Sequence, residues 1–299
     1  MSVLRTLWGE NAVRGALWMT AASVMIASSA ICVRQLSGQF SPFELVFLRS
    51  LIGTILLSPW MIRMSRGGTL RTTRLPLYLL RTGLSYSGMV CVFYGIGHMP
   101  IGEVYALLFL VPLITVVLAV LLLKEHAGIH AWIACAVGFG GALVILRPGI
   151  IAIGLAAGAV MVTAVTYAAT NICIKSLSRT DSPVQITIIG YLLALPLAAV
   201  PTIFVWKTPG WQDVPWILAL GAFQTLGGLC HARSVQAADA RVVQPFNFLR
   251  LPVSVVLAWF LFAELPSAWT WLGAAMIFAA SYYVLHRESA ARRRKARAE

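Results

Sequence analysis

Hydrophobic residues fill this chain in long stretches, which short clusters of charged residues, proline and glycine separate. A helix that crosses the hydrocarbon core of a bilayer needs about 20 predominantly apolar residues. The pattern predicts ten such helices, at approximately 13–33, 42–62, 75–97, 101–123, 127–146, 150–175, 183–206, 213–235, 242–263 and 267–286. Because the connections between them are short, we predict an all-α polytopic membrane protein without a soluble domain.

One segment of the chain occurs twice. Residues 109–125 and 248–264 align without a gap at an offset of 139, and eight positions are identical, Phe109/Phe248 among them. The offset pairs the fourth predicted helix with the ninth and the fifth with the tenth, so each half holds five helices. Internal duplication of apolar helices is typical of membrane transporters that are built from two related halves.

The odd number of helices per half determines how the halves are related. Two halves in tandem that each cross the membrane five times must run through it in opposite senses. We therefore predict two inverted five-helix repeats, at 13–147 and 150–286, and a basic cytoplasmic tail at 287–299.

The composition excludes a soluble protein. Hydrophobic residues make up 59% of the 299 positions and charged residues only 11%, whereas soluble domains carry about 25% charged residues. The five cysteines lie in apolar stretches without metal-ligand spacing, so we interpret them as packing residues. The net charge of +13 does not indicate a nucleic-acid partner, because six basic residues follow the last predicted helix directly.

The basic residues predict the orientation of the chain. With the N-terminus placed in the cytoplasm, seventeen Lys and Arg fall on the cytoplasmic side, three on the outer side and three within helices. Cytoplasmic connections of membrane proteins carry an excess of Lys and Arg. We therefore predict that both termini are cytoplasmic.

Several short stretches resemble one family of transporters. They are Ser-Pro-Phe-Glu-Leu-Val-Phe-Leu-Arg at 41–49, Arg-Thr-Gly-Leu at 81–84, Tyr-Gly-Ile-Gly-His-Met-Pro at 94–100, Lys-Glu at 124–125, Gly-Phe-Gly-Gly at 138–141 and Ile-Leu-Arg-Pro-Gly at 145–149. In this order they resemble the EamA-type permeases of the drug/metabolite transporter superfamily. The resemblance implies ten helices in two EamA repeats, and transport of small organic metabolites through a central cavity, often as export.

Arg250 is the sharpest candidate for substrate binding. It lies nine residues after Arg241 at the inner end of its helix, and at 1.5 Å per residue this places it about 14 Å into the membrane. A charge at this depth costs at least about 2.5–3.5 kcal/mol on insertion scales, so it needs water, a partner or a ligand. Helical spacing places four polar residues on one side of the helix: Gln244, Asn247, Arg250 and Ser254.

We interpret this polar stripe as a cavity wall in which Arg250 binds a carboxylate or phosphate of the substrate. The alternative is a structural arginine that helix carbonyls or a neighbouring amide satisfy. The repeat equivalent of Arg250 is Val111, so the two halves do not share the charge.

Further substrate-binding candidates lie on other helices. Glu103 and Tyr105 begin the fourth predicted helix. Glu103 is interpreted as a partner for a basic group, for a proton or for Arg250, or else as an interfacial carboxylate near a helix N-terminus. The resemblance implies that the third, sixth and eighth helices help to line the cavity, and their polar and aromatic residues complete the set: Tyr86, Tyr94, Tyr167, Asn171, Gln224 and His231.

Other charged residues and prolines receive structural interpretations. Glu44 and Arg49, five positions apart, are expected to form an ion pair inside the helix bundle, with substrate contact by Arg49 as the alternative. Arg81 is expected to extend its side chain to the inner interface. Pro112 and Pro252 are expected to break their helices, to free a backbone carbonyl nearby and to act as gating positions.

Small residues predict close helix packing. The sequence Gly-Leu-Ala-Ala-Gly at 154–158 and the glycines of 138–141 are expected to let helices approach each other within one chain, with dimerisation as the alternative. We expect a monomer or a homodimer that is surrounded by membrane lipids, in the inner or plasma membrane.

These features favour a secondary transporter that works by alternating access. The sequence offers no convincing nucleophile–base pair, metal motif or phosphate-gripping loop, which disfavours an intramembrane enzyme. It also shows no ring of repeated charge, which disfavours a channel. We expect no cofactor, no metal and no nucleic-acid partner.

The expected cargo is a small organic metabolite. Our first interpretation is an amino acid, amine or related zwitterion, with export as the expected direction. The alternative is uptake of a cofactor-like or nucleoside-like metabolite such as S-adenosylmethionine.

Overall fold

The structure is a computed structural model, and it describes residues 10–66, 72, 74–123, 129–147, 154–178, 180–181, 183–238, 243 and 246–296. All regular secondary structure in these residues is helical. The chain divides into two compact units, and neither is a continuous stretch of sequence.

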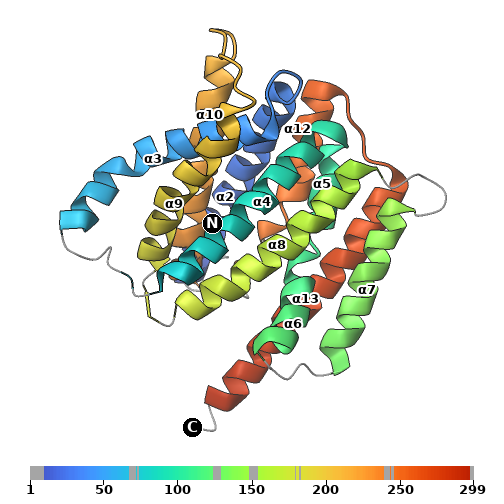
Figure 1. The fold of residues 1–299 in the computed structure, drawn as a ribbon. Helices are drawn as coiled ribbons and strands as arrows, with labels where there is room; N and C mark the ends of the chain where they lie inside the picture. The colour runs from blue at the N-terminus through green and yellow to red at the C-terminus, as the bar shows by residue number, and fades with distance from the viewer. Residues whose placement is uncertain are drawn as a thin grey trace. The chain divides into compact units, whose positions relative to one another are not determined.

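The first unit combines residues 1–27, 100–153 and 226–299. Its complete helices are α5 (Ile101–Leu108), α6 (Val111–Leu123), α7 (Ile129–Leu146), α12 (Arg250–Phe262) and α13 (Ala268–Ala296). The start of α2 (Glu10–Leu36) and the end of α10 (Val214–Ala237) also belong to it. Helix α13 packs along α7, and α5 packs against α12, as the red and green helices of Figure 1 show for the first pair.

The second unit combines residues 28–99 and 154–225. Its complete helices are α3 (Pro42–Arg66), α4 (Leu75–His98), α8 (Leu155–Leu177) and α9 (Pro183–Ile203). Helix α4 packs along α8, and α9 contacts both α3 and α4. Part of its core is formed by Tyr78, Leu177 and Ile186, which are all buried.

Each compact unit takes helices from both predicted halves of the chain. Helices α7 and α13, which pack along each other, come from opposite halves, and so do α4 and α8. A five-helix repeat that cannot bury its apolar faces alone packs against its partner repeat in this way. The halves at 13–147 and 150–286 therefore differ from the compact units, and as repeats they stay a prediction.

The helix boundaries recur at the offset of the sequence repeat. Adding 139 to the bounds of α4 gives 214–237, which are the bounds of α10, and adding it to those of α6 gives 250–262, the bounds of α12. Helices α7 and α13 begin 139 residues apart, at Ile129 and Ala268. The periodicity thus extends well beyond the stretch in which residue identities reveal it.

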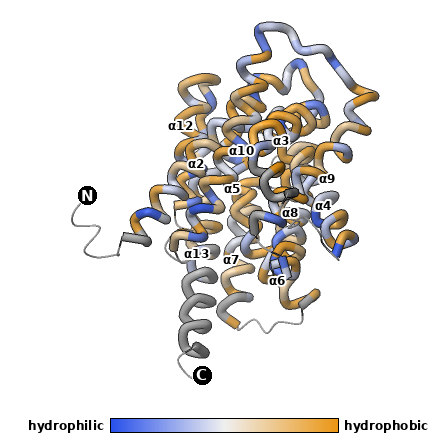
Figure 2. Tube along the Cα trace, turned by 90° about the vertical axis from the view of Figure 1, so that its left-hand side faces the viewer, coloured by the Kyte–Doolittle hydropathy of each residue, from blue (hydrophilic) through white to orange (hydrophobic). Residues whose placement is uncertain are grey.

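Six of the described helical segments are long and apolar enough to cross a membrane: Val13–Leu36, Pro42–Pro59, Ile101–Leu122, Leu155–Leu177, Gln185–Ile203 and Val214–Ala237. Shorter apolar helices occur at Trp132–Leu146, Arg250–Phe262 and Ala268–Ala280. Figure 2 shows hydrophobic residues along most of the helical trace. A polytopic helical protein is consistent with this, and ten membrane crossings stay a prediction.

The glycine patches behave differently from each other. A Cβ atom on Gly141 would lie 2.8 Å from the carbonyl oxygen of Gly273, so α7 and α13 approach closely at this pair. A Cβ atom on Gly154 or on Gly158 would meet no atom within 4 Å among the described residues. The patch on α7 therefore packs within the chain as expected, whereas Gly154 and Gly158 do not take part in described helix packing.

Candidate functional site

Two helix breaks of the first unit lie at equivalent positions of the sequence repeat. Helix α5 ends at Leu108 and α6 begins at Val111, and the turn between them consists of Phe109 and Leu110. Their equivalents Phe248 and Leu249 form the turn that precedes α12. Both turns use short-range bonds: Leu110 N donates to Leu107 O at 3.0 Å, and Leu249 N to Phe246 O at 3.2 Å.

The two prolines begin helices instead of breaking them. Pro112 and Pro252 lie in the first turns of α6 and α12, where a backbone N–H has no intrahelical partner to lose. The expectation that each proline frees a carbonyl inside a continuous helix was wrong for this reason. The breaks themselves lie two to four residues before the prolines.

Arg250 is the first residue of α12 and is half-buried. Its Nη2 donates to Oδ1 of Asn247 at 2.8 Å, and its Cζ lies 6.0 Å from the centre of the Tyr105 ring. Buried Tyr105 donates from its hydroxyl to the carbonyl oxygen of Ile26 on α2 at 3.1 Å, which fixes its ring. The structure thus brings together three of the predicted residues, Arg250, Asn247 and Tyr105, on three different segments of one unit.

A cluster of aromatic rings includes Phe248, which precedes this arginine by two residues in the chain. Phe248 packs edge-on against its repeat equivalent Phe109, with ring centroids 4.7 Å apart, and against Phe278 of α13 at 4.5 Å. The ring of Phe278 in turn stacks on that of Tyr282 at 6.2 Å. Two equivalent residues in contact are what a pseudo-two-fold relation between repeats produces on its axis. This unit therefore holds aromatic rings, which can contact a flat solute, and the Arg250 guanidinium, which can donate hydrogen bonds to one.

The rest of the predicted stripe does not join this group. Ser254 is fully buried and donates to Leu251 O of its own helix at 2.8 Å, which favours a packing role. Gln244 lies outside the described residues. The stripe also assumed one continuous helix, whereas α12 begins only at Arg250.

Two further candidates lie in the first unit. His231 of α10 is half-buried and interacts electrostatically with Arg250. Glu103 of α5 accepts a hydrogen bond from Thr270 Oγ1 of α13 at 3.3 Å. Glu103 is therefore held at the start of α13, which agrees with its interfacial interpretation.

The remaining candidates are distributed over the second unit. Tyr86 lines a cavity, Tyr94 stacks on His98 with ring centroids 4.1 Å apart, and Gln224 donates to Ser29 Oγ at 2.9 Å. Tyr167 packs where a side chain on Gly88 would otherwise lie, and Asn171 is exposed on α8. These side chains lie on α4, α8 and α10.

The predicted ion pair between Glu44 and Arg49 was wrong. Five residues on an α-helix rotate the side chain by about 140°, so the two point in different directions. Glu44 is fully buried, and its carboxylate accepts from Ser41 N at 3.1 Å and from the backbone N–H of Lys207. Because Glu44 N in turn donates to Ser41 Oγ, the sequence Ser-Pro-Phe-Glu is a capping box that begins α3.

Removal of this carboxylate should lower stability measurably. In Glu44→Ala the partly buried N–H groups of Ser41 and Lys207 lose their acceptor, and we expect a loss of about 1–3 kcal/mol. Thermal unfolding of the detergent-purified protein measures it. Asp213→Ala is the matched control, because the Asp213 carboxylate accepts one exposed bond, from Gly210 N. An unchanged melting temperature in Glu44→Ala would contradict the capping role.

Sequence reasoning missed the aromatic group and the surroundings of Arg49. The identity of Phe109 and Phe248 at the repeat offset was a signal for the first of these. Arg49 instead donates to the Tyr191 hydroxyl of α9 at 3.1 Å, a contact across 142 residues that no local pattern indicates.

Comparison with known proteins identifies the protein family to which the chain is similar. A family model described as the EamA-like transporter family matches residues 13–147 and 154–286. A riboflavin transporter of Vibrio cholerae is 31% identical over 291 residues, which cover 96% of this chain and 97% of that protein.

More distant relatives carry other names. An S-adenosylmethionine uptake transporter of Rickettsia felis is 26% identical over 93% of this chain and 94% of that protein. The pseudopaline exporter CntI of Pseudomonas aeruginosa is 26% identical over 89% and 94%, respectively. One crystal structure is similar with a TM-score of 0.62 at 18% identity, over 90% of this chain and 96% of that one, which shows the fold alone.

Proposed function

Because the chain belongs to the EamA-like transporter family, we propose that it is a secondary carrier for a cofactor-like metabolite with a flat aromatic ring, and that riboflavin is the first solute to test. Family and relatives indicate a multi-pass protein of the inner membrane that moves a small molecule. The proposal concerns the identity of that molecule and the residues that hold it.

The observation that carries the proposal is that one unit holds both the Arg250–Tyr105 contact and the Phe109–Phe248 pair. Aromatic rings bind a planar heterocycle by stacked and edge-on contacts, while a guanidinium donates to its carbonyl oxygens. Charges deep inside membrane proteins commonly mark a substrate path. The break before α12 adds to this, because half-helix ends near the midplane are common solute sites in transporters.

The names of the relatives favour the cofactor-like class over the amino-acid class. One relative is named for riboflavin and another for S-adenosylmethionine. Their names cover uptake as well as export, and a facilitated carrier moves its solute down whichever gradient exists. An amino acid, amine or zwitterion stays the alternative cargo, with Arg250 on its carboxylate.

The proposal includes two inverted five-helix repeats, alternating access and cytoplasmic termini. The recurrence of helix bounds at the offset of 139 supports the repeats, and the distribution of Lys and Arg supports the orientation. Reporter fusions at either terminus test the orientation. Activity of a periplasmic reporter at the C-terminus would contradict it.

Equilibrium binding of radiolabelled riboflavin to the purified protein tests the substrate directly. We expect saturable binding that unlabelled riboflavin displaces and that amino acids, nucleosides and simple amines do not. Absence of riboflavin binding, together with binding of a labelled amino acid, would replace the proposed cargo with the alternative one.

A further inference from the structure

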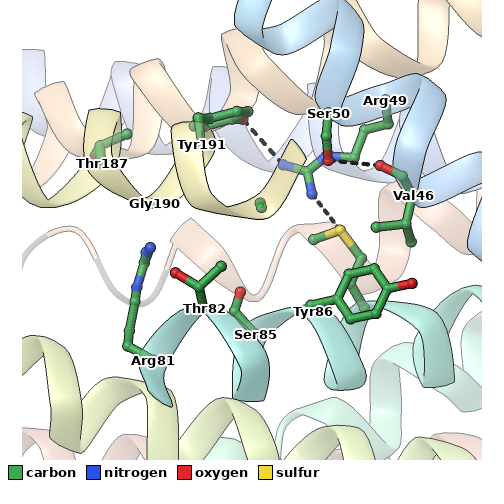
Figure 3. Close-up of a pocket in the computed structure, with 12 residues that line it drawn as sticks. Val46, Arg49, Ser50, Arg81, Thr82, Ser85, Tyr86, Thr187, Gly190 and Tyr191 are labelled. Carbon is green, nitrogen blue, oxygen red and sulfur yellow. Dashed lines mark hydrogen bonds between the residues drawn. The ribbon is translucent and has the colours of Figure 1, made fainter. Parts of the chain in front are cut away.

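The second unit contains a cavity that the proposed function does not use. Helices α3, α4 and α9 enclose it, and its volume is about 90 Å³, room for several water-sized spheres. Figure 3 shows Arg49 reaching into it from α3 and Arg81 rising from α4 toward α9. It therefore has two guanidinium groups in its wall.

No carboxylate is among the described residues that line this cavity. Arg49 donates to the Tyr191 hydroxyl at 3.1 Å and to the sulfur of Met89, and its Cζ lies 5.5 Å from the Tyr191 ring centre. These partners are neutral, so they leave the charge of the arginine uncompensated. Two cations in one partly enclosed site are strongly unfavourable unless an anion joins them.

The same cavity wall contains buried polar atoms that lack partners. They are Arg49 Nε, Arg81 Nε, Thr82 Oγ1 and the Tyr86 hydroxyl, each without a hydrogen bond within the described part of the chain. Buried donors are rarely left in this condition in native proteins, and each deserves an explanation. Their gathering around one cavity indicates that a ligand belongs there.

The α9 backbone is shaped to admit the Arg81 side chain. A Cβ atom on Gly190 would collide with Nη1 of Arg81, so any side chain at this position would displace the guanidinium from α9. Arg81 is therefore held in the wall of the cavity and does not extend to the inner interface as the sequence suggested. Its donors stay inside the unit.

We propose that this cavity binds an oxyanion, the carboxylate or phosphate group of a small solute. Planar guanidinium forks match the two oxygens of such groups, and the hydroxyls of Thr82 and Tyr86 add neutral donors. Arg49 lies seven residues beyond the start of α3 and Arg81 six beyond that of α4, about 10 Å into each helix. A free solute reaches this depth more readily than a lipid headgroup, which lies at the interface.

This inference does not depend on riboflavin, which carries no ionised group at neutral pH.

The test uses the purified full chain in neutral detergent and follows thermal unfolding in sodium phosphate, succinate and chloride at equal ionic strength. Because phosphate also stabilises proteins by general exclusion at high concentration, the expected result is a shift that saturates at low millimolar phosphate or succinate. Chloride should give no saturable shift.

A second set of measurements distinguishes binding of a soluble anion from binding of an anionic lipid headgroup. Micelles doped with phosphatidylglycerol replace the soluble anions. Stabilisation by this lipid alone would overturn binding of a soluble anion, and no saturable shift with any probe would overturn the site.

Substitutions in the cavity wall test whether the anion binds in this cavity. Arg81→Gln should weaken the apparent affinity about tenfold or more, because a charge-assisted hydrogen bond is lost. Gly190→Ala retains both charges but displaces Arg81, so it should also weaken anion binding. If Arg81→Gln does not fold, Gly190→Ala alone tests whether Arg81 takes part in binding. Arg74→Gln is the control, since Arg74 donates to Ser176 O at 2.9 Å and does not line the cavity. Wild-type affinity in Gly190→Ala or in Arg81→Gln would contradict the proposal.

Discussion

Replacement of Arg250 by alanine is expected to reduce riboflavin transport by about 100-fold, while the protein still inserts and folds. Arg250 lies beside Tyr105 and Asn247, directly after a helix break, and loss of a charged donor to a bound solute removes about 1.5–3 kcal/mol of binding. Folding should survive because removal of a charge from the predicted mid-membrane position relieves an insertion cost of about 2.5–3.5 kcal/mol. The initial rate of labelled riboflavin uptake per folded protein in proteoliposomes measures the effect.

Two further variants test whether the effect depends on the guanidinium of Arg250 in particular. Arg250→Lys keeps the charge without the planar fork and should recover only part of the rate. Arg233→Ala removes an exposed arginine of the same unit, whose Cζ lies 5.0 Å from the Trp18 ring centre, and should leave transport unchanged. Normal transport by Arg250→Ala would show that the arginine has a structural role.

Gly273→Leu is expected to prevent recovery of a folded protein. Gly273 lies where α13 crosses α7, and a Cβ atom there would collide with Gly141 O and approach Ile145 Cγ1 to 2.5 Å. Backbone atoms cannot yield as a flexible side chain can, so the added volume should cost about 1–3 kcal/mol or more. The monodisperse peak on gel filtration and the melting temperature measure the loss.

Gly158→Leu is the matched control for this substitution. It adds the same side chain to another apolar helix, at a position where a Cβ atom meets nothing within 4 Å in the described structure. Its melting temperature should stay close to that of the unchanged protein. Equal stability of the two variants would contradict the close α7–α13 crossing.

Local patterns were sufficient to predict where helices occur, while the repeats stay a prediction. Each predicted segment overlaps at least one described helix, because burial in lipid requires a continuous apolar stretch. The repeat offset found in the segments 109–125 and 248–264 recurs in the bounds of α4 and α10. The breaks at Phe109 and Phe248 were not predicted, since apolarity continues through them and hydropathy cannot distinguish a turn from a helix.

The side-chain partners could not be predicted in the same way. Arg250 and Asn247 are three positions apart, so their contact across the turn is local in the sequence. Tyr105, Tyr191 and Gly190 reach their arginines across long stretches of sequence, through packing of helices from different halves. The capping box at Ser41 and Glu44 was predictable from its residues, and the search for an ion pair obscured it.

Counterflow in proteoliposomes tests the central claim most directly. Vesicles that contain the purified protein are loaded with unlabelled riboflavin and diluted into a trace of labelled riboflavin. A carrier of this solute should accumulate the label transiently above its equilibrium level, and Arg250→Ala vesicles should not. Linear uptake without accumulation, or counterflow that only amino acids support, would contradict a riboflavin-type carrier that binds its solute at Arg250.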